Sequence, residues 1–128
     1  GSCKFIHGYA RYIEVTFACS SLNEQQWVMD FGGLNKLNDW LHQQWDHRLL
    51  ISSDDPLLQD FKMLHDKDGC NLNIMDINKG WGPGIESSCK FVFDYADNWI
   101  KQLTSNRVWI SKIQIWEHEK NSAILSIE

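Results

Sequence analysis

A thiol and an imidazole stand close together near the start of the sequence. Cys3 and His7 are four residues apart, just before a segment with the pattern of a strand. A thiol near an imidazole can be held as the thiolate and can act as a base or a nucleophile. From spacing alone, the simpler interpretation is a buried cysteine beside an incidental histidine.

A carboxylate precedes a second imidazole near the middle of the sequence. Asp46 and His47 follow a segment with helical periodicity. A carboxylate can orient an imidazole ring and raise its basicity, which proton transfer requires. Side chains of adjacent residues seldom bond to each other, so the simpler alternative is a solvated helix end.

A third candidate group is the carboxylate of Glu117, at the end of an apolar segment. A carboxylate there can accept two hydrogen bonds from the N–H edge of a heterocycle. More often such a side chain faces solvent. His42, His65 and His118 are dispersed along the chain and are interpreted as surface residues.

The elements that must position these groups follow from the hydrophobic pattern. Residues 9–19 alternate with period two and contain many β-branched and aromatic side chains, so they predict a strand. Residues 26–31 are interpreted as its hairpin partner. Residues 107–117 and 123–127 predict a second hairpin, with a turn at 121–122. Residues 71–77 predict one further short strand.

Apolar residues at helical spacing predict helices between these strands. One runs from Leu34 to Trp45, a short one covers residues 57–65, and a long one runs from Ile85 to Leu103. Residues 79–84 contain three glycines and a proline, so they predict a loop. Two hairpins flanking helices indicate the α+β class, with the helices on one face of an antiparallel sheet.

Length, net charge and the cysteine and tryptophan content limit which classes of protein this chain can belong to. A chain of 128 residues fits one domain, and its net charge of −5 argues against binding nucleic acid or an anionic membrane. Four dispersed cysteines are interpreted as reduced thiols of a cytoplasmic protein, and seven tryptophans favour burial between subunits of an oligomer. Gly1-Ser2 has the form of a cloning scar, which leaves open that a native N-terminal strand precedes it.

The order of short motifs along the chain carries more weight than any one of them. Cys-x3-His-Gly is followed by Asp-Phe-Gly-Gly-Leu at 30–34, by Asp-His-Arg-Leu-Leu at 46–50, and by a glutamate closing the penultimate strand. This order resembles the 6-pyruvoyl-tetrahydropterin synthase family. The likeness is greater to its bacterial 6-carboxy-tetrahydropterin synthase branch, which feeds the synthesis of queuosine and other 7-deazaguanines. It implies one tunnelling-fold domain over residues 1–128, with a four-stranded antiparallel sheet and two main helices on one face.

The resemblance also implies roles for individual residues. Cys3 matches the catalytic thiol that moves protons at the substrate side chain. Asp46 and His47 match acid–base partners that reach the site from a neighbouring subunit. Glu117 matches the carboxylate that anchors the pterin, and Glu86 lies where the family commonly has Thr-x-Glu-Asn, although that threonine is missing here.

The implied activity is that of a carbon–carbon lyase working in a trimer-based oligomer, with a hexamer as the default. Its substrate would be 7,8-dihydroneopterin triphosphate, converted to 6-carboxy-tetrahydropterin with loss of acetaldehyde and triphosphate. The alternative is a pterin-binding oligomer that has lost or changed its chemistry. An aldolase or cyclohydrolase relative fits the motif order less well.

The resemblance implies a catalytic zinc ion held by three histidines, but the sequence matches only one ligand. His7 is the first histidine of the family's His-x-His pair, and Tyr9 replaces the second. A catalytic zinc ion needs about three protein ligands. Three explanations stay open: further ligands precede this sequence, the metal uses other residues, or the protein has altered its zinc chemistry.

Overall fold

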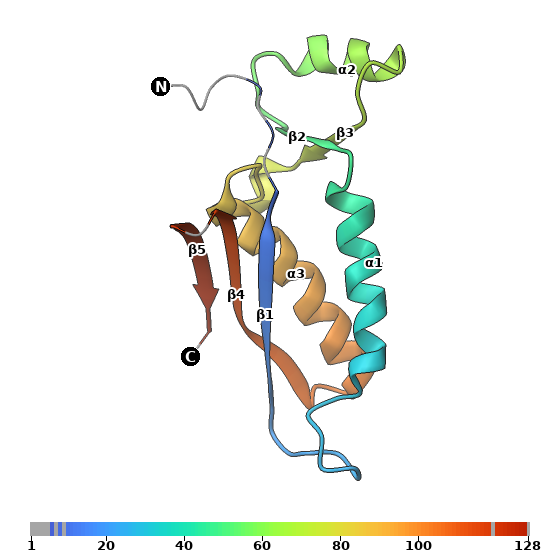
Figure 1. Cartoon of the computed structure of the whole chain (residues 1–128), viewed down its shortest axis with the longest axis vertical. Helices are drawn as coiled ribbons and strands as arrows, with labels where there is room; N and C mark the ends of the chain where they lie inside the picture. Colours follow the sequence, from blue (N-terminus) through green and yellow to red (C-terminus); the bar gives the residue numbers. More distant parts are fainter. Residues whose placement is uncertain (1–5, 7, 9, 119, 128) are drawn as a thin grey trace.

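The computed structural model describes residues 6, 8, 10–118 and 120–127. Over these residues the main sheet has three strands in the order β1-β4-β5, all antiparallel (Figure 1). They are β1 (Tyr12–Cys19), β4 (Val108–His118) and β5 (Asn121–Ser126). The predicted C-terminal hairpin is therefore confirmed. Its last strand starts at Asn121, so the predicted turn residues 121–122 already pair with β4.

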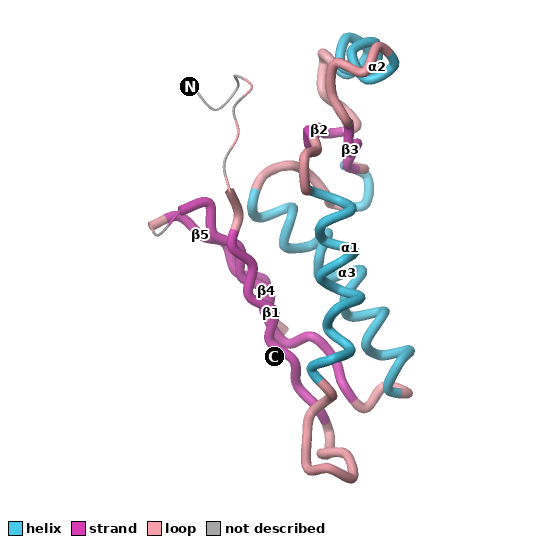
Figure 2. The backbone as a smooth tube through the Cα atoms, turned by 45° about the vertical axis from the view of Figure 1, so that its right-hand side comes forward, coloured by secondary structure: helices cyan, strands magenta, loops and turns pink. Residues whose placement is uncertain are grey.

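Two helices cover one face of this sheet. They are α1 (Leu34–Trp45) and α3 (Ile85–Thr104), which lie on the same side of the strands in Figure 2. The α3 helix contacts β4 and β5, and α1 packs on α3 through the stacked rings of Trp40 and Tyr95, whose centroids are 3.9 Å apart. The predicted α+β class, with the helices on one face of an antiparallel sheet, is confirmed.

A second, smaller sheet lies beyond the C-terminal end of α1. It contains β2 (Leu49–Ser52) and β3 (Leu72–Met75), which run parallel and are linked through α2 (Leu58–Asp66). Parallel strands need such a crossover connection. The strand at 71–77 and the short helix at 57–65 were predicted, whereas β2 was missed because its Leu-Leu-Ile run does not alternate between apolar and polar residues.

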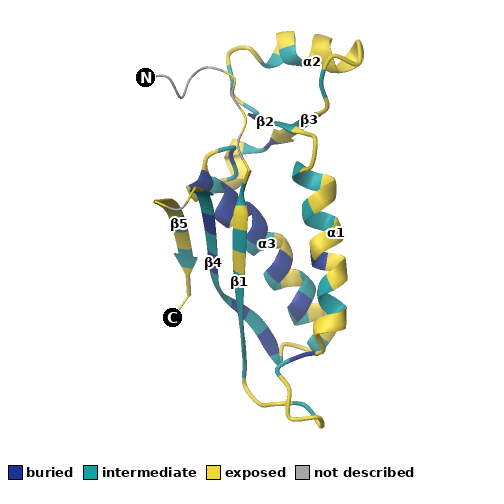
Figure 3. Cartoon of the chain, viewed as in Figure 1, coloured by how far each residue is buried: buried dark blue, intermediate teal, exposed yellow. Residues whose placement is uncertain are grey.

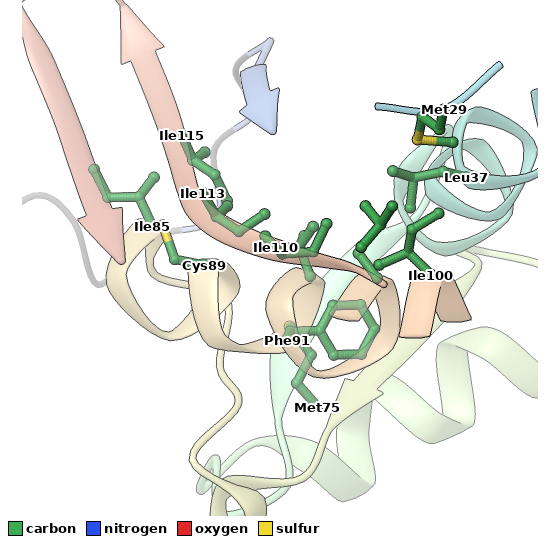
Figure 4. Packing of buried hydrophobic residues seen from close by; sticks show 13 residues of the cluster. Met29, Leu37, Met75, Ile85, Cys89, Phe91, Ile100, Ile110, Ile113 and Ile115 are labelled. Carbon is green, nitrogen blue, oxygen red and sulfur yellow. The ribbon is translucent and has the colours of Figure 1, made fainter. Parts of the chain in front are cut away.

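The core lies between α3 and the middle of β4. Buried residues follow the apolar stripe of α3 and the inward-facing positions of β4, as the dark bands in Figure 3 and the packed side chains in Figure 4 show. The fully covered members are Val92, Ala96, Ile100, Val108, Ile110, Ile113 and Ile115. These contacts hold the start of α3 beside the end of β4, where the candidate site lies.

The predicted strand at 26–31 is wrong, and with it the N-terminal hairpin and the four-strand count. The Asn23 side chain accepts hydrogen bonds from the backbone N–H groups of Gln25 and Trp27, both at 3.0 Å. Gln26 has a φ of 67°, which an extended strand does not allow. The segment is therefore a turn closed by an asparagine, and β1 pairs with β4 instead.

Candidate functional site

Glu117 and Glu86, which come from different elements, face the same hollow. Its volume is about 400 Å³, and its lining includes Gly84 and Glu86 at the start of α3, Glu117 near the end of β4, and Lys120 and Asn121 in and after the β4–β5 turn. Glu117 is half-buried and Glu86 is exposed. Two carboxylates in one hollow provide acceptors for several N–H groups of a ligand.

A second hollow lies beside the first and shares Glu117 with it. Its volume is about 530 Å³, and it is also lined by Arg11, Tyr12, Trp116 and His118. The rings of Tyr12 and Trp116 meet edge to face, with centroids 5.3 Å apart. Glu117 therefore stands between a polar hollow and one with an aromatic wall. Sequence reasoning missed Arg11 and this aromatic pair as site residues, because the strand pattern of residues 9–19 also contains the charged Glu14 and does not set Arg11 apart.

The loop before α3 shapes the first hollow. Gly80 has a φ of 78°, and a Cβ there would lie 3.0 Å from the Lys90 side chain, so only glycine fits without strain. Ser88 is completely buried and its hydroxyl donates to the Gly82 carbonyl at 3.0 Å. Arg11 donates to the Ser88 hydroxyl at 2.7 Å and to the Pro83 carbonyl. The start of α3 is thus tied to the start of β1.

Asp46 and His47 lie at the C-terminal end of α1. The His47 Nδ1 atom is 3.0 Å from Asp46 Oδ1, so these adjacent side chains do contact each other, with His47 in the left-handed region at a φ of 55°. The His47 side chain is 91% exposed. Neither residue lines a hollow with Glu117. The preceding residue, Trp45, links them to that region, because its ring centroid lies 4.9 Å from the Arg11 guanidinium carbon.

The predicted groups Cys3 and His7 lie outside the described residues. Among the residues that are described, no group of three His, Cys, Asp or Glu side chains is placed to hold a metal ion. His65 and His118 accept backbone hydrogen bonds at Nδ1, from Leu72 and Lys120 respectively. The described donors do not fit a three-ligand zinc site, and zinc stays a prediction that depends on His7.

The described cysteines are not obvious bases. Cys19, Cys70 and Cys89 are free thiols. Burial raises the pKa of the Cys89 thiol, and the Glu86 carboxylate adds to this rise. Cys89 therefore stays protonated near neutral pH, although it lies one turn of α3 after Glu86.

Of the helices in the described part of the chain, none is long and apolar enough to span a membrane.

Comparison with known proteins identifies the family. The model of the family described as 6-pyruvoyl tetrahydropterin synthase matches residues 1–128. A protein of Aquifex aeolicus named 6-carboxy-5,6,7,8-tetrahydropterin synthase is 27% identical over 122 residues, covering 94% of this chain and 74% of that protein. One of the same name from Rickettsia typhi is 33% identical over 54 residues, covering 41% of this chain and 39% of that protein.

A solved structure supports the fold. The crystal structure of an uncharacterized protein from Wolinella succinogenes matches with a TM-score of 0.82 and 21% identity, covering 99% of this chain and 82% of that one. The family match covers the whole chain, and the order of motifs read from the sequence agrees with it. This chain belongs to the 6-pyruvoyl tetrahydropterin synthase family.

Proposed function

We propose that this protein is a 6-carboxy-5,6,7,8-tetrahydropterin synthase-like lyase acting on 7,8-dihydroneopterin triphosphate, in queuosine or other 7-deazaguanine biosynthesis. The observation that carries the proposal is the convergence of Glu117 and Glu86 on one hollow of about 400 Å³. That volume is within the range of small-molecule sites, roughly 300–1,000 Å³. The similarity to proteins named 6-carboxy-5,6,7,8-tetrahydropterin synthase supports this choice of reaction.

In this proposal Glu117 is the pterin anchor. An aminopyrimidine ring presents N–H donors along one edge, and a carboxylate can accept two of them in a charge-assisted pair. Glu117 is half-buried, so water competes less for its oxygens than at an exposed position. Glu86, in the first turn of α3, offers a second acceptor in the same hollow.

The proton transfers are assigned to Cys3 and to the Asp46–His47 pair. Cys3 would move protons at the substrate side chain as a thiolate. Asp46 and His47 contact each other and are exposed, and they line neither hollow of their own chain. This placement supports a relay that serves the site of a neighbouring subunit, so the active form would be a homo-oligomer, a trimer or a pair of trimers.

The alternative is a pterin-binding oligomer without lyase activity, and Tyr9 in place of a second histidine favours that alternative. A turnover assay separates the two. The wild-type protein, assayed with and without added zinc, is expected to release acetaldehyde and 6-carboxy-tetrahydropterin. Cys3→Ala is expected to lower turnover by at least about 100-fold while pterin affinity stays within about twofold, because it removes only a proton-transfer group.

The matched control is Cys70→Ala, which removes a thiol that contacts the Phe61 carbonyl, away from both hollows. It should leave turnover unchanged. Pterin binding without any product, with or without zinc, would contradict the lyase and support the binding oligomer. Failure to bind a pterin at all would contradict both.

Subunit mixing tests the proposed shared site. Glu117→Gln and His47→Ala are each expected to abolish most turnover alone. Oligomers reassembled from equal amounts of both variants should recover roughly a quarter of wild-type activity, because about one site in four then combines an intact Glu117 with an intact His47 from a neighbour. Activity no higher than that of the separate variants would place all of these groups within one chain.

A further inference from the structure

Arg11 brings together three segments that are far apart in the sequence. It lies immediately before β1, and its guanidinium donates to the Ser88 hydroxyl at 2.7 Å on α3 and to the Pro83 carbonyl in the preceding loop. The guanidinium carbon also lies 4.9 Å from the centroid of Trp45, the last residue of α1. One side chain therefore contacts the start of α3 and the end of α1 from beside the edge strand β1.

The position of Arg11 in the sheet places it beside Glu117. Tyr12 pairs with Trp116 at the end of the β1–β4 ladder, so Arg11 and Glu117 are the next residues along. Ile13 and Ile115, further into the sheet, pack in the core. Arg11 and Glu117 line one hollow at the end of this ladder, where the β4–β5 register shifts between Trp116 and His118.

Ser88 links Arg11 to the loop before α3 through two hydrogen bonds. Its buried hydroxyl receives the Arg11 hydrogen bond and donates its own to the Gly82 carbonyl at 3.0 Å. Arg11 contacts the Pro83 carbonyl directly. Two successive carbonyls before α3 thus depend on one guanidinium, and the helix that starts there carries Glu86.

The contact with Trp45 reaches toward the Asp46–His47 pair. The Trp45 indole N–H is buried, and within the described residues it has no hydrogen-bond partner. The indole is therefore held by ring contacts, with the guanidinium on it and Phe91 at 6.3 Å between centroids. A stacked guanidinium on an indole is an attractive pair. Its loss would leave the last turn of α1 with fewer restraints.

We infer that Arg11 is a positioning residue that fixes Glu86, Glu117 and the Asp46–His47 segment relative to one another. The effect of Arg11 on pterin binding rests on the proposed function above. Its effect on the order of residues 82–88 and 45–48 does not. Arginine suits the role because a planar guanidinium can bond two acceptors and stack on a ring at once. Lysine could keep the charge and one hydrogen bond but not this combination.

The test compares Arg11→Met and Arg11→Lys with the matched control Arg107→Met. Arg107 also bonds two partners, the Ser21 and Val28 carbonyls, both at 2.7 Å, but at the opposite end of the molecule. Amide hydrogen exchange is expected to become faster at residues 82–88 and 45–48 in Arg11→Met, and at 21–28 in Arg107→Met. Arg11→Lys should fall between wild type and Arg11→Met.

Binding of 7,8-dihydroneopterin is measured on the same proteins. The dissociation constant is expected to rise by about tenfold or more in Arg11→Met, with partial rescue in Arg11→Lys, because misplaced binding groups lose affinity steeply. It should stay within about twofold in Arg107→Met. A purely structural role would reduce the folded fraction and the turnover number of both methionine variants without changing the dissociation constant.

The outcomes separate this inference from the proposed function. Wild-type affinity in Arg11→Met, or exchange at 82–88 and 45–48 equal to wild type, overturns the positioning role. If Arg11→Met does not fold, Arg11→Lys is judged by the same two criteria. A wild-type protein that binds no pterin refutes the proposed function, and the exchange data then decide the role of Arg11 alone.

Discussion

Replacing Glu117 by glutamine is expected to raise the dissociation constant for 7,8-dihydroneopterin by about 100-fold, the value of a lost charge-assisted hydrogen-bond pair. Glutamine keeps the shape of the side chain and one acceptor oxygen, but it turns an NH₂ donor toward the donors of the ring. Because Glu117 lines both hollows, no other candidate carboxylate can replace it from the same place. Isothermal titration calorimetry measures the change directly.

The control for this variant is Glu24→Gln. Glu24 is exposed in the loop after β1, which leaves the sheet beside the start of β4, whereas Glu117 lies near the end of β4. The same change of charge there should leave the dissociation constant within about twofold, as surface substitutions usually do. Equal affinities of the Glu117→Gln and wild-type proteins would mean that the pterin binds elsewhere.

Replacing Ile100 by alanine is expected to lower the free energy of unfolding by about 3 kcal/mol. Ile100 is 0% exposed in the stripe of α3 that packs on β4, so its removal leaves a cavity in the core. The surrounding side chains belong to both a helix and a sheet and cannot close that cavity without moving one against the other. Urea unfolding followed by circular dichroism gives the difference.

Leu103→Ala provides the matched comparison on the same helix. It removes the same number of carbon atoms three residues later, where the side chain is 61% exposed. Its effect on the free energy of unfolding should be below about 0.5 kcal/mol. A loss similar to that of Ile100→Ala would show that Leu103 is covered in the native assembly and that exposure in the single chain is the wrong guide.

Helix α3 and strand β4 could be predicted from the sequence because their signals are local and long. The apolar stripe from Ile85 recurs over five turns, and its prediction to Leu103 agrees with the observed end at Thr104. Strand β4 was expected at residues 107–117 and covers Val108–His118. Over such lengths the periodicity outweighs the preferences of single residues.

The pairing of the strands could not be predicted in the same way. Residues 26–31 have the composition of a strand, but the Asn23 side chain bonds the backbone before them and closes a turn. The true partner of β1 is β4, about 90 residues later, and that choice depends on tertiary packing rather than local sequence. The parallel pairing of β2 with β3 is likewise a contact between distant segments.

Prediction of the candidate site was similarly uneven. Glu117 was singled out for its chemistry at a strand end and Glu86 only through resemblance to a family, and the structure places both around one hollow. Asp46 and His47 were singled out for their chemistry, and they contact each other away from that hollow. Arg11 was not singled out, because its role appears only when β1, α1 and α3 are brought together. A side chain that acts through three distant segments has no signature within any one of them.

The unit formed by β2, α2 and β3 can accept extra residues without disturbing the two hollows that Glu117 lines. In the described structure α2 buries none of its side chains, and the connection that follows it, with Asp68 at a φ of 61°, is exposed. Lengthening a surface connection costs little entropy, about 0.6 kcal/mol for each doubling. Foreign peptides or extra turns inserted at residues 67–69 should therefore be tolerated, since β2 and β3 remain anchored at Ile51 and Met75.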